Sequence, residues 1–299
     1  MQLLDCALVA QLAYQSSDYV QVVWRVAHGE SSAADHDGFS ADLLGTRMTE
    51  LDPDHVALMK QVPEPPEFSD DHTSDADCYT FRIQPENAQP SLVLAYRGTS
   101  SWQDCLCDAD LILMELEPEL FPGALVHRGF HGQFSALRKH TDPRVAGWKG
   151  QILCTGHSLG SIAALAALFY SKSNKTYLRT FGSPKLGNAS LARYIDNRVE
   201  DHIRVTAGSD PISKMPLSLQ YVHSKAAHHV GRADIHPCVP MLTDIQDHDL
   251  AKSYISLLKD PVYKAPSWSE YMLGFFMNKL MSVKVFGVKV TLWSWLRRK

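Results

Sequence analysis

The chain has 299 residues, of which 45% are hydrophobic and 21% are charged, and its formal net charge at pH 7 is −4. This balance is typical of a soluble globular protein that buries a substantial core. The negative net charge, and the lack of a basic stripe with interleaved aromatic residues, argue against nucleic acid as a partner.

The N-terminal residues predict a helix and give no sign of a secretory signal. Apolar side chains recur from Leu3 to Tyr14 with helical spacing, while residues 1–5 carry no basic group. Six cysteines are scattered without a metal-type spacing, which indicates a reduced compartment and no metal site. We therefore expect a protein that is cytoplasmic, or exported without a classical signal peptide.

The next part of the chain predicts an α/β fold with a mostly parallel sheet. The acidic, proline-containing residues 63–77 are expected to form a solvated loop. Strand-like runs follow at 78–83, 91–97, 151–155, 179–182 and 202–206. Helical spans precede each of the last two runs, and strands separated by helices favour a parallel sheet with helices on its faces.

Residues 156–160 read Gly-His-Ser-Leu-Gly and match the G-x-S-x-G pattern of a nucleophile elbow. The apolar run 151–155 precedes the pattern, and the Ala/Leu-rich run 161–168 follows it. This is the strand, sharp turn and helix that the elbow requires, and glycines leave room where strand and helix converge. Ser158 is therefore the predicted nucleophile.

A serine nucleophile needs a general base, and the base needs an acid that orients it. Asp210 follows the strand-like run 203–206, where an acid is expected, although an aspartate before proline is also common in turns. His248 lies between Asp247 and Asp249, just before a predicted helix at 250–258. On this reasoning alone the choice of base stays open among five downstream histidines: His223, His228, His229, His236 and His248.

Several ordered segments make the chain resemble the class 3, fungal-type lipases. They are Tyr-Arg-Gly-Thr at 96–99, Val-His-Arg-Gly-Phe at 126–130, the elbow, the run from Thr180 to Asn188, the run from Arg204 to Pro211, and Asp247-His248 followed by Tyr254. The resemblance covers residues 3–258 and implies an α/β-hydrolase fold. It also implies a triad of Ser158, Asp210 and His248, and a structural role for His223.

The same resemblance assigns the remaining site residues. Thr99 matches the oxyanion residue of the family, with the backbone N–H groups of Thr99 and Leu159 as donors. The family carries its lid between Thr99 and Val126, where Trp102 and Leu106 lie four residues apart and form one apolar helical face. This lid is only modestly apolar.

We divide the chain into an α/β-hydrolase domain, residues 1–260, and a basic and aromatic C-terminal extension, residues 261–299. Lysines interrupt every apolar run of the extension before it reaches the length of a membrane span. Its composition suits peripheral contact with a membrane, a partner-binding tail, or an element packed on the domain.

The sequence thus predicts an enzyme, a serine hydrolase that cleaves carboxylic esters of lipids and resembles triacylglycerol lipases. The mechanism requires no cofactor. Within the enzymes, a phospholipase and a short-chain carboxylesterase remain alternatives. An inactive, lipase-like scaffold that binds lipid is the alternative from another class.

Overall fold

A computed structural model of the chain describes residues 1–31, 51–71, 76–84, 89–98, 111–231, 247–260, 282–285 and 288–291. A seven-stranded sheet forms its centre, with the strand order β1-β2-β3-β6-β7-β8-β9. The bounds are β1 (Glu67–Asp71), β2 (Ala76–Ile83), β3 (Ser91–Tyr96), β6 (Gln151–His157), β7 (Thr176–Phe181), β8 (Asp201–Ala207) and β9 (Ala227–Val230). The strands from β3 to β9 pair in parallel, whereas β1 and β2 are antiparallel at one edge. The predicted, mostly parallel sheet is confirmed.

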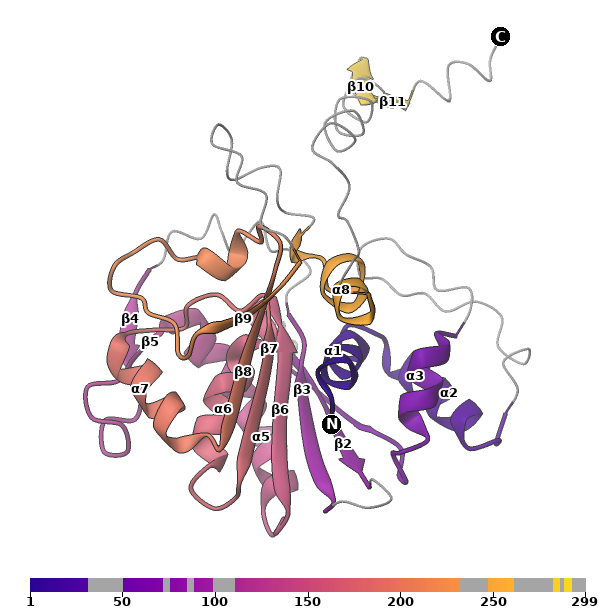
Figure 1. The fold of residues 1–299 in the computed structure, drawn as a ribbon, viewed down its shortest axis with the longest axis horizontal. Coiled ribbons are helices and arrows are strands. Elements are labelled where there is room, and N and C mark those ends of the chain that lie inside the picture. Colours follow the sequence, from indigo (N-terminus) through magenta and orange to yellow (C-terminus); the bar gives the residue numbers. More distant parts are fainter. Residues whose placement is uncertain are drawn as a thin grey trace.

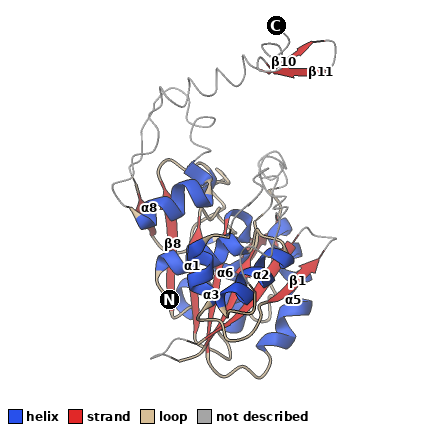
Figure 2. Ribbon diagram, turned by 90° about the vertical axis from the view of Figure 1, so that its right-hand side faces the viewer, coloured by secondary structure: helices blue, strands red, loops and turns tan. Residues whose placement is uncertain are grey.

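Helices cover both faces of the sheet (Figures 1 and 2). One face carries α5 (Arg128–Val145), α6 (Ala163–Tyr170) and α7 (Ala189–Arg198). The other face carries α1 (Leu3–Leu12), α2 (Ser17–Ala27), α3 (Pro53–Met59), α8 (Ser256–Lys259) and the π-helix η5 (Leu250–Ile255). Within β3, Leu92 and Leu94 join the first core, while Val93 and Ala95 join the second. A strand covered on both faces needs apolar side chains at successive positions, which explains the continuous apolar run.

The acidic segment expected to be a loop contains an edge strand. In β1, Phe68 lies opposite Tyr79 of β2, and the centroids of their rings are 4.7 Å apart. Charged side chains are common on edge strands because they discourage pairing with other chains. The prediction of a loop over 63–77 was therefore wrong for residues 67–71 and for residues 76–77, which begin β2, because strand pairing outweighs the local composition.

The described part of the C-terminal extension also forms strands, which the sequence did not predict. β10 (Ser282–Val285) and β11 (Val288–Thr291) pair antiparallel, with Val283 opposite Val290. In the described part of the chain, no helix combines the length and the apolar character that crossing a membrane requires.

A buried histidine links the helices on the α1 side of the sheet. His55 of α3 is 0% exposed, and its Nε2 lies 3.1 Å from Oε1 of Gln11. That oxygen can only accept, so Nε2 carries the proton and Nδ1 accepts the Tyr19 hydroxyl hydrogen across 3.1 Å. Burial lowers the pKa of His55 from 6.5 to about 4. His55 is therefore neutral in the folded protein at neutral pH.

This histidine is expected to make the fold sensitive to acid. Between pH 6.5 and about 4, the unfolded chain binds a proton at His55 that the folded chain does not, so the free energy of unfolding falls as pH falls. Over this range the loss is about 3 kcal/mol. Urea unfolding at pH 7.0 and pH 4.5 would show a loss about 2 kcal/mol smaller in His55→Gln. Equal losses in the two proteins would contradict the expectation.

Candidate active site

Ser158 lies in a sharp turn directly after β6 and is the first residue of the short 3₁₀-helix η2 (Ser158–Ile162). Its φ angle is 58°, a left-handed conformation that is rare for a residue with a side chain. A Cβ atom at Gly156 would overlap the carbonyl oxygen of Gly160, and one at Gly160 would overlap that of Tyr96. Both glycines are thus required for the turn that presents Ser158.

Ser158, His248 and Asp210 form one hydrogen-bonded series. The Oγ atom of Ser158 lies 2.8 Å from Nε2 of His248, and Nδ1 of His248 lies 2.9 Å from Oδ2 of Asp210. The carboxylate accepts the Nδ1 proton, which leaves Nε2 free to accept the serine hydroxyl hydrogen. The structure therefore brings the three sequence-predicted residues together in the geometry that serine activation needs.

Asp210 follows β8 and is 1% exposed. Its Oδ1 accepts the backbone N–H of Ile212 across 2.8 Å, and its Oδ2 accepts the Tyr254 hydroxyl hydrogen in a short bond. Burial alone would raise the pKa of Asp210, but its bonds with His248 and Tyr254 hold that pKa below its usual value. The buried carboxylate is therefore ionised, and its hydrogen bonds hold it in one orientation.

The backbone around His248 is held on both sides. Oδ2 of Asp247 accepts the backbone N–H of Ser209 across 2.7 Å. Oδ1 of Asp249 accepts the backbone N–H of Lys252 across 2.9 Å and caps η5. The two flanking aspartates thus position the chain that carries His248, while Asp210 is the carboxylate that contacts the imidazole.

His157, the residue before Ser158, adds a third restraint on His248. Its Nε2 lies 2.7 Å from the carbonyl oxygen of His248, so Nε2 carries the proton. Its Nδ1 accepts the hydroxyl hydrogen of Tyr14, whose oxygen is 2.9 Å away. Burial and the neighbouring His248 lower the pKa of His157 to about 3. A neutral His157 therefore joins the end of α1, the elbow and the His248 segment.

Two further glycines allow backbone to approach this series closely. Gly182 has a φ of 57°, and a Cβ atom there would come within 2.8 Å of Asp210 Oδ2 and 2.9 Å of His248. A Cβ atom at Gly98 would overlap the Tyr14 hydroxyl and come within 3.2 Å of Ser158 Cβ. The chain that leaves β3 therefore passes directly beside Ser158.

Three of the predicted site residues, Thr99, Trp102 and Leu106, lie outside the described residues. Leu159 follows Ser158 in the first turn of η2, where backbone N–H groups have no partner within the helix. Its N–H is thus available to a group bound at Ser158.

The other candidate histidines lie elsewhere. Nε2 of His223 donates to the carbonyl oxygen of Ser213 across 2.6 Å and holds the chain after Asp210. His228 and His229 are exposed in β9, a strand that the sequence did not predict, and His236 lies outside the described residues. Among the described residues, no group of three or more His, Cys, Asp or Glu side chains could hold a metal.

Sequence reasoning gave no role to Tyr14, His157 or Tyr254. Tyr254 was visible as the aromatic residue after Asp247-His248, and His157 as a variable position of the elbow pattern. No sequence signal links Tyr14 to the elbow, because 143 positions separate it from His157.

Comparisons with known proteins find similarity to lipases. Residues 93–220 match the family model described as lipase (class 3). The secreted mono- and diacylglycerol lipase A of Penicillium cyclopium is 32% identical over 168 residues, which cover 52% of each chain. The secreted mono- and diacylglycerol lipase 2 of Gibberella zeae is 31% identical over 165 residues, 44% of this chain and 40% of the relative. The chain thus matches about half the length of these curated relatives.

Solved structures resemble the fold over a larger share of the chain. The triacylglyceride lipase of Rhizomucor miehei has a TM-score of 0.60 and 16% identity, covering 82% of this chain and 90% of its own. A mutant form of MDLA from Penicillium cyclopium has a TM-score of 0.52 and 24% identity, covering 77% and 93%. At this identity the likeness shows the fold alone, which is the α/β-hydrolase fold.

Proposed function

We propose that this chain belongs to the class 3 lipase family, whose model is matched by residues 93–220, and that it hydrolyses carboxylic ester bonds of lipids, with acylglycerols as the substrate class. The observation that carries the proposal is the hydrogen-bonded series from Ser158 through His248 to Asp210. The names of the curated relatives favour mono- and diacylglycerols within this class.

In the proposed reaction, Ser158 Oγ attacks the ester carbonyl carbon while His248 Nε2 takes the hydroxyl proton. The tetrahedral intermediate collapses as the C–O bond to the alcohol breaks, and His248 returns the proton to that leaving oxygen. Water then attacks the acyl-enzyme through the same base, which releases the fatty acid and restores Ser158. Asp210 keeps the imidazole in the required tautomer and stabilises the imidazolium that forms.

The negative oxygen of the intermediate needs preorganised donors. We assign one to the backbone N–H of Leu159, at the start of η2. The other proposed donor is Thr99, and the close approach of its neighbour Gly98 to Ser158 supports this assignment. Removing one such donor typically costs about 10²–10³ in rate.

An exposed apolar segment that follows Asp210 in the chain supports action on aggregated lipid. After Asp210 the chain forms the short helix η3 (Ile212–Lys214) and then exposes Leu217, Leu219 and Val222, which are 69%, 99% and 40% exposed. Apolar groups exposed together mark contact surfaces for other molecules or membranes. We propose that this segment and the lid residues Trp102 and Leu106 face the lipid.

We also propose that residues 1–260 form the catalytic domain and that residues 261–299 are an extension in peripheral contact with a membrane. Basic and aromatic residues in the extension favour this contact. The curated relatives are named as secreted, so export is the localisation that they favour for this chain. Deleting residues 268–299 is expected to weaken liposome binding while the protein stays folded, and unchanged binding would remove the membrane role.

Active-site labelling tests the proposal directly. A fluorophosphonate probe is expected to label the wild-type chain and not Ser158→Ala, and a folded chain that is not labelled at Ser158 would be an inactive scaffold. Initial rates on mono-, di- and triacylglycerols, a phospholipid and nitrophenyl esters of graded chain length then separate a lipase from a phospholipase or a short-chain esterase.

His157 is expected to act as a positioning residue for His248. His157→Phe removes the donor to the His248 carbonyl, and a displaced base is expected to lower kcat about 10²-fold with little change in KM. In His157→Gln the side-chain amide can again donate to this carbonyl, so part of kcat should return. A loss in His157→Phe that appears in KM, or no rescue by glutamine, would contradict this role.

A further inference from the structure

A small polar pocket lies on the α7 side of the sheet, under α7 and between the ends of two loops. The sheet register places Thr180 of β7 beside Arg204 of β8, and alternate positions of β8 bring His202 to the same face. All three side chains line the pocket, and Ala192 of α7 and Val222 lie on its other sides. This pocket is distinct from the site around Ser158.

Three polar atoms of these side chains have no hydrogen-bond partner in the described part of the chain. They are Nε of Arg204, Nδ1 of His202 and Oγ1 of Thr180. The three residues are 8%, 4% and 1% exposed, so water at the surface does not solvate them freely. Each of these atoms can carry a hydrogen and donate it, in the case of His202 as the Nδ1 tautomer. Two of these donors, on Arg204 and Thr180, have no polar partner among the described residues, whereas Nδ1 of His202 lies 3.7 Å from Oδ1 of Asp196.

Among the described residues, the positive charge of the pocket has no counter-charge. None of its lining residues is acidic, and no carboxylate forms an ion pair with Arg204 among the described residues. Two acidic residues next to the pocket residues pair elsewhere: Oδ2 of Asp196 accepts the backbone N–H of Lys225 while its Oδ1 lies 3.7 Å from Nδ1 of His202, and Asp201 pairs with Arg179. The guanidinium itself donates to the Lys225 carbonyl across a long 3.4 Å. A buried cation without a counter-charge is costly.

We propose that this pocket binds a small inorganic anion of halide type, held by Arg204 and Thr180, with His202 beside them. The space is about that of one water molecule, so phosphate and carboxylic acids are too large and a monatomic halide is the anion closest to it in size. A single water could accept from the donors but could not neutralise the guanidinium. The bound anion would join β7 and β8 to the loop before β9, and its binding would stabilise the folded chain.

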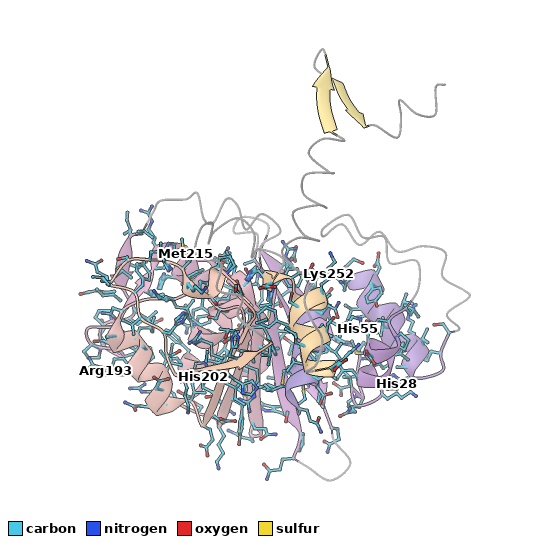
Figure 3. All side chains as sticks on the ribbon, turned by 45° about the horizontal axis from the view of Figure 1, so that its top comes forward. His28, His55, Arg193, His202, Met215 and Lys252 are labelled. Carbon is cyan, nitrogen blue, oxygen red and sulfur yellow. The ribbon has the colours of Figure 1, made fainter. Side chains whose placement is uncertain are left out.

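The register of β8 and β9 identifies a position where a substituted side chain can take the place of the anion. Ala227 lies directly beside Arg204, and in a parallel pair such neighbours share a face. Ala227→Glu places a carboxylate next to the guanidinium and is expected to replace the anion. Ala227→Gln adds the same bulk without the charge. Arg193→Met is a further control, because Arg193 lies at the outer edge of the molecule while His202 lies further in (Figure 3).

The test compares melting temperatures at one ionic strength in sodium chloride and in sodium gluconate, whose anion is too large to enter. The wild-type chain, Ala227→Gln and Arg193→Met are expected to melt about 2–4 °C higher in chloride. Ala227→Glu is expected to lose this difference and to melt above Ala227→Gln in gluconate. Arg204→Met should also lose the difference in melting temperature between the two salts. If Arg204→Met does not fold, the comparison of Ala227→Glu with Ala227→Gln still tests the proposal.

Crystals soaked in sodium bromide provide the direct observation. An anomalous peak within hydrogen-bond distance of Arg204 Nε is expected in the wild-type chain and not in Ala227→Glu. The proposal is overturned if no peak appears in the pocket, or if Ala227→Glu keeps the full chloride effect. Neither readout depends on hydrolysis, so the outcome is independent of the proposed function.

Discussion

Replacing Ser158 with alanine is expected to lower kcat for ester hydrolysis about 10⁶-fold, and His248→Ala is expected to cost about as much. The double variant should be no slower than either single variant, because the hydroxyl and the imidazole act as one unit across their 2.8 Å hydrogen bond. Initial rates on an emulsified acylglycerol, with enzyme concentration set by protein assay, give all three values.

Ser161 provides a matched control for this series. It lies three residues after Ser158, is fully buried, and its Oγ has no hydrogen-bond partner in the described part of the chain. Ser161→Ala therefore makes the same chemical change nearby and is expected to leave kcat unchanged. If the fold-decrease in kcat of the double variant equals the product of the two single fold-decreases, Ser158 and His248 do not act together.

The sequence was sufficient to predict the chemistry of the series but not the restraints around it. The elbow pattern and its apolar flanks identified Ser158, and the order of strand ends narrowed the acid to Asp210. Local patterns could not choose among five histidines, and the family resemblance was needed to favour His248. The contact of His157 with Tyr14 depends on how α1 packs against β6, which is a tertiary fact with no local signature.

The same limit explains the errors in the fold. The edge strand β1 depends on pairing with β2, and β9, with its two exposed histidines, depends on pairing with β8. Both strands lie in polar segments whose composition is typical of loops. The buried strands were predictable because burial on both faces selects apolar residues at successive positions, a signal that edge strands lack.

Asp210→Asn is expected to lower kcat about 10⁴-fold while the chain stays folded. The asparagine oxygen can still accept the N–H of Ile212, but its amide then faces His248 and donates to Nδ1. Nε2 must then carry the imidazole proton and can no longer accept the proton of Ser158. The expected loss thus arises from the wrong tautomer at an intact site, which a crystal structure of the variant would show.

Tyr254→Phe tests whether Asp210 acts by fixing the tautomer of His248 or only by its packing in the site. It removes the hydroxyl that donates to Oδ2 but leaves the carboxylate and its contact with His248 in place. The free energy of unfolding is expected to fall by about 1.5–3 kcal/mol, while kcat should fall far less than in Asp210→Asn. Because the Tyr254 hydroxyl helps to hold the pKa of Asp210 below its usual value, that pKa is expected to rise in Tyr254→Phe. The kcat values of the two variants are therefore compared at pH 8. An equal kcat in the two variants would mean that Asp210 acts through packing and not through the imidazole tautomer.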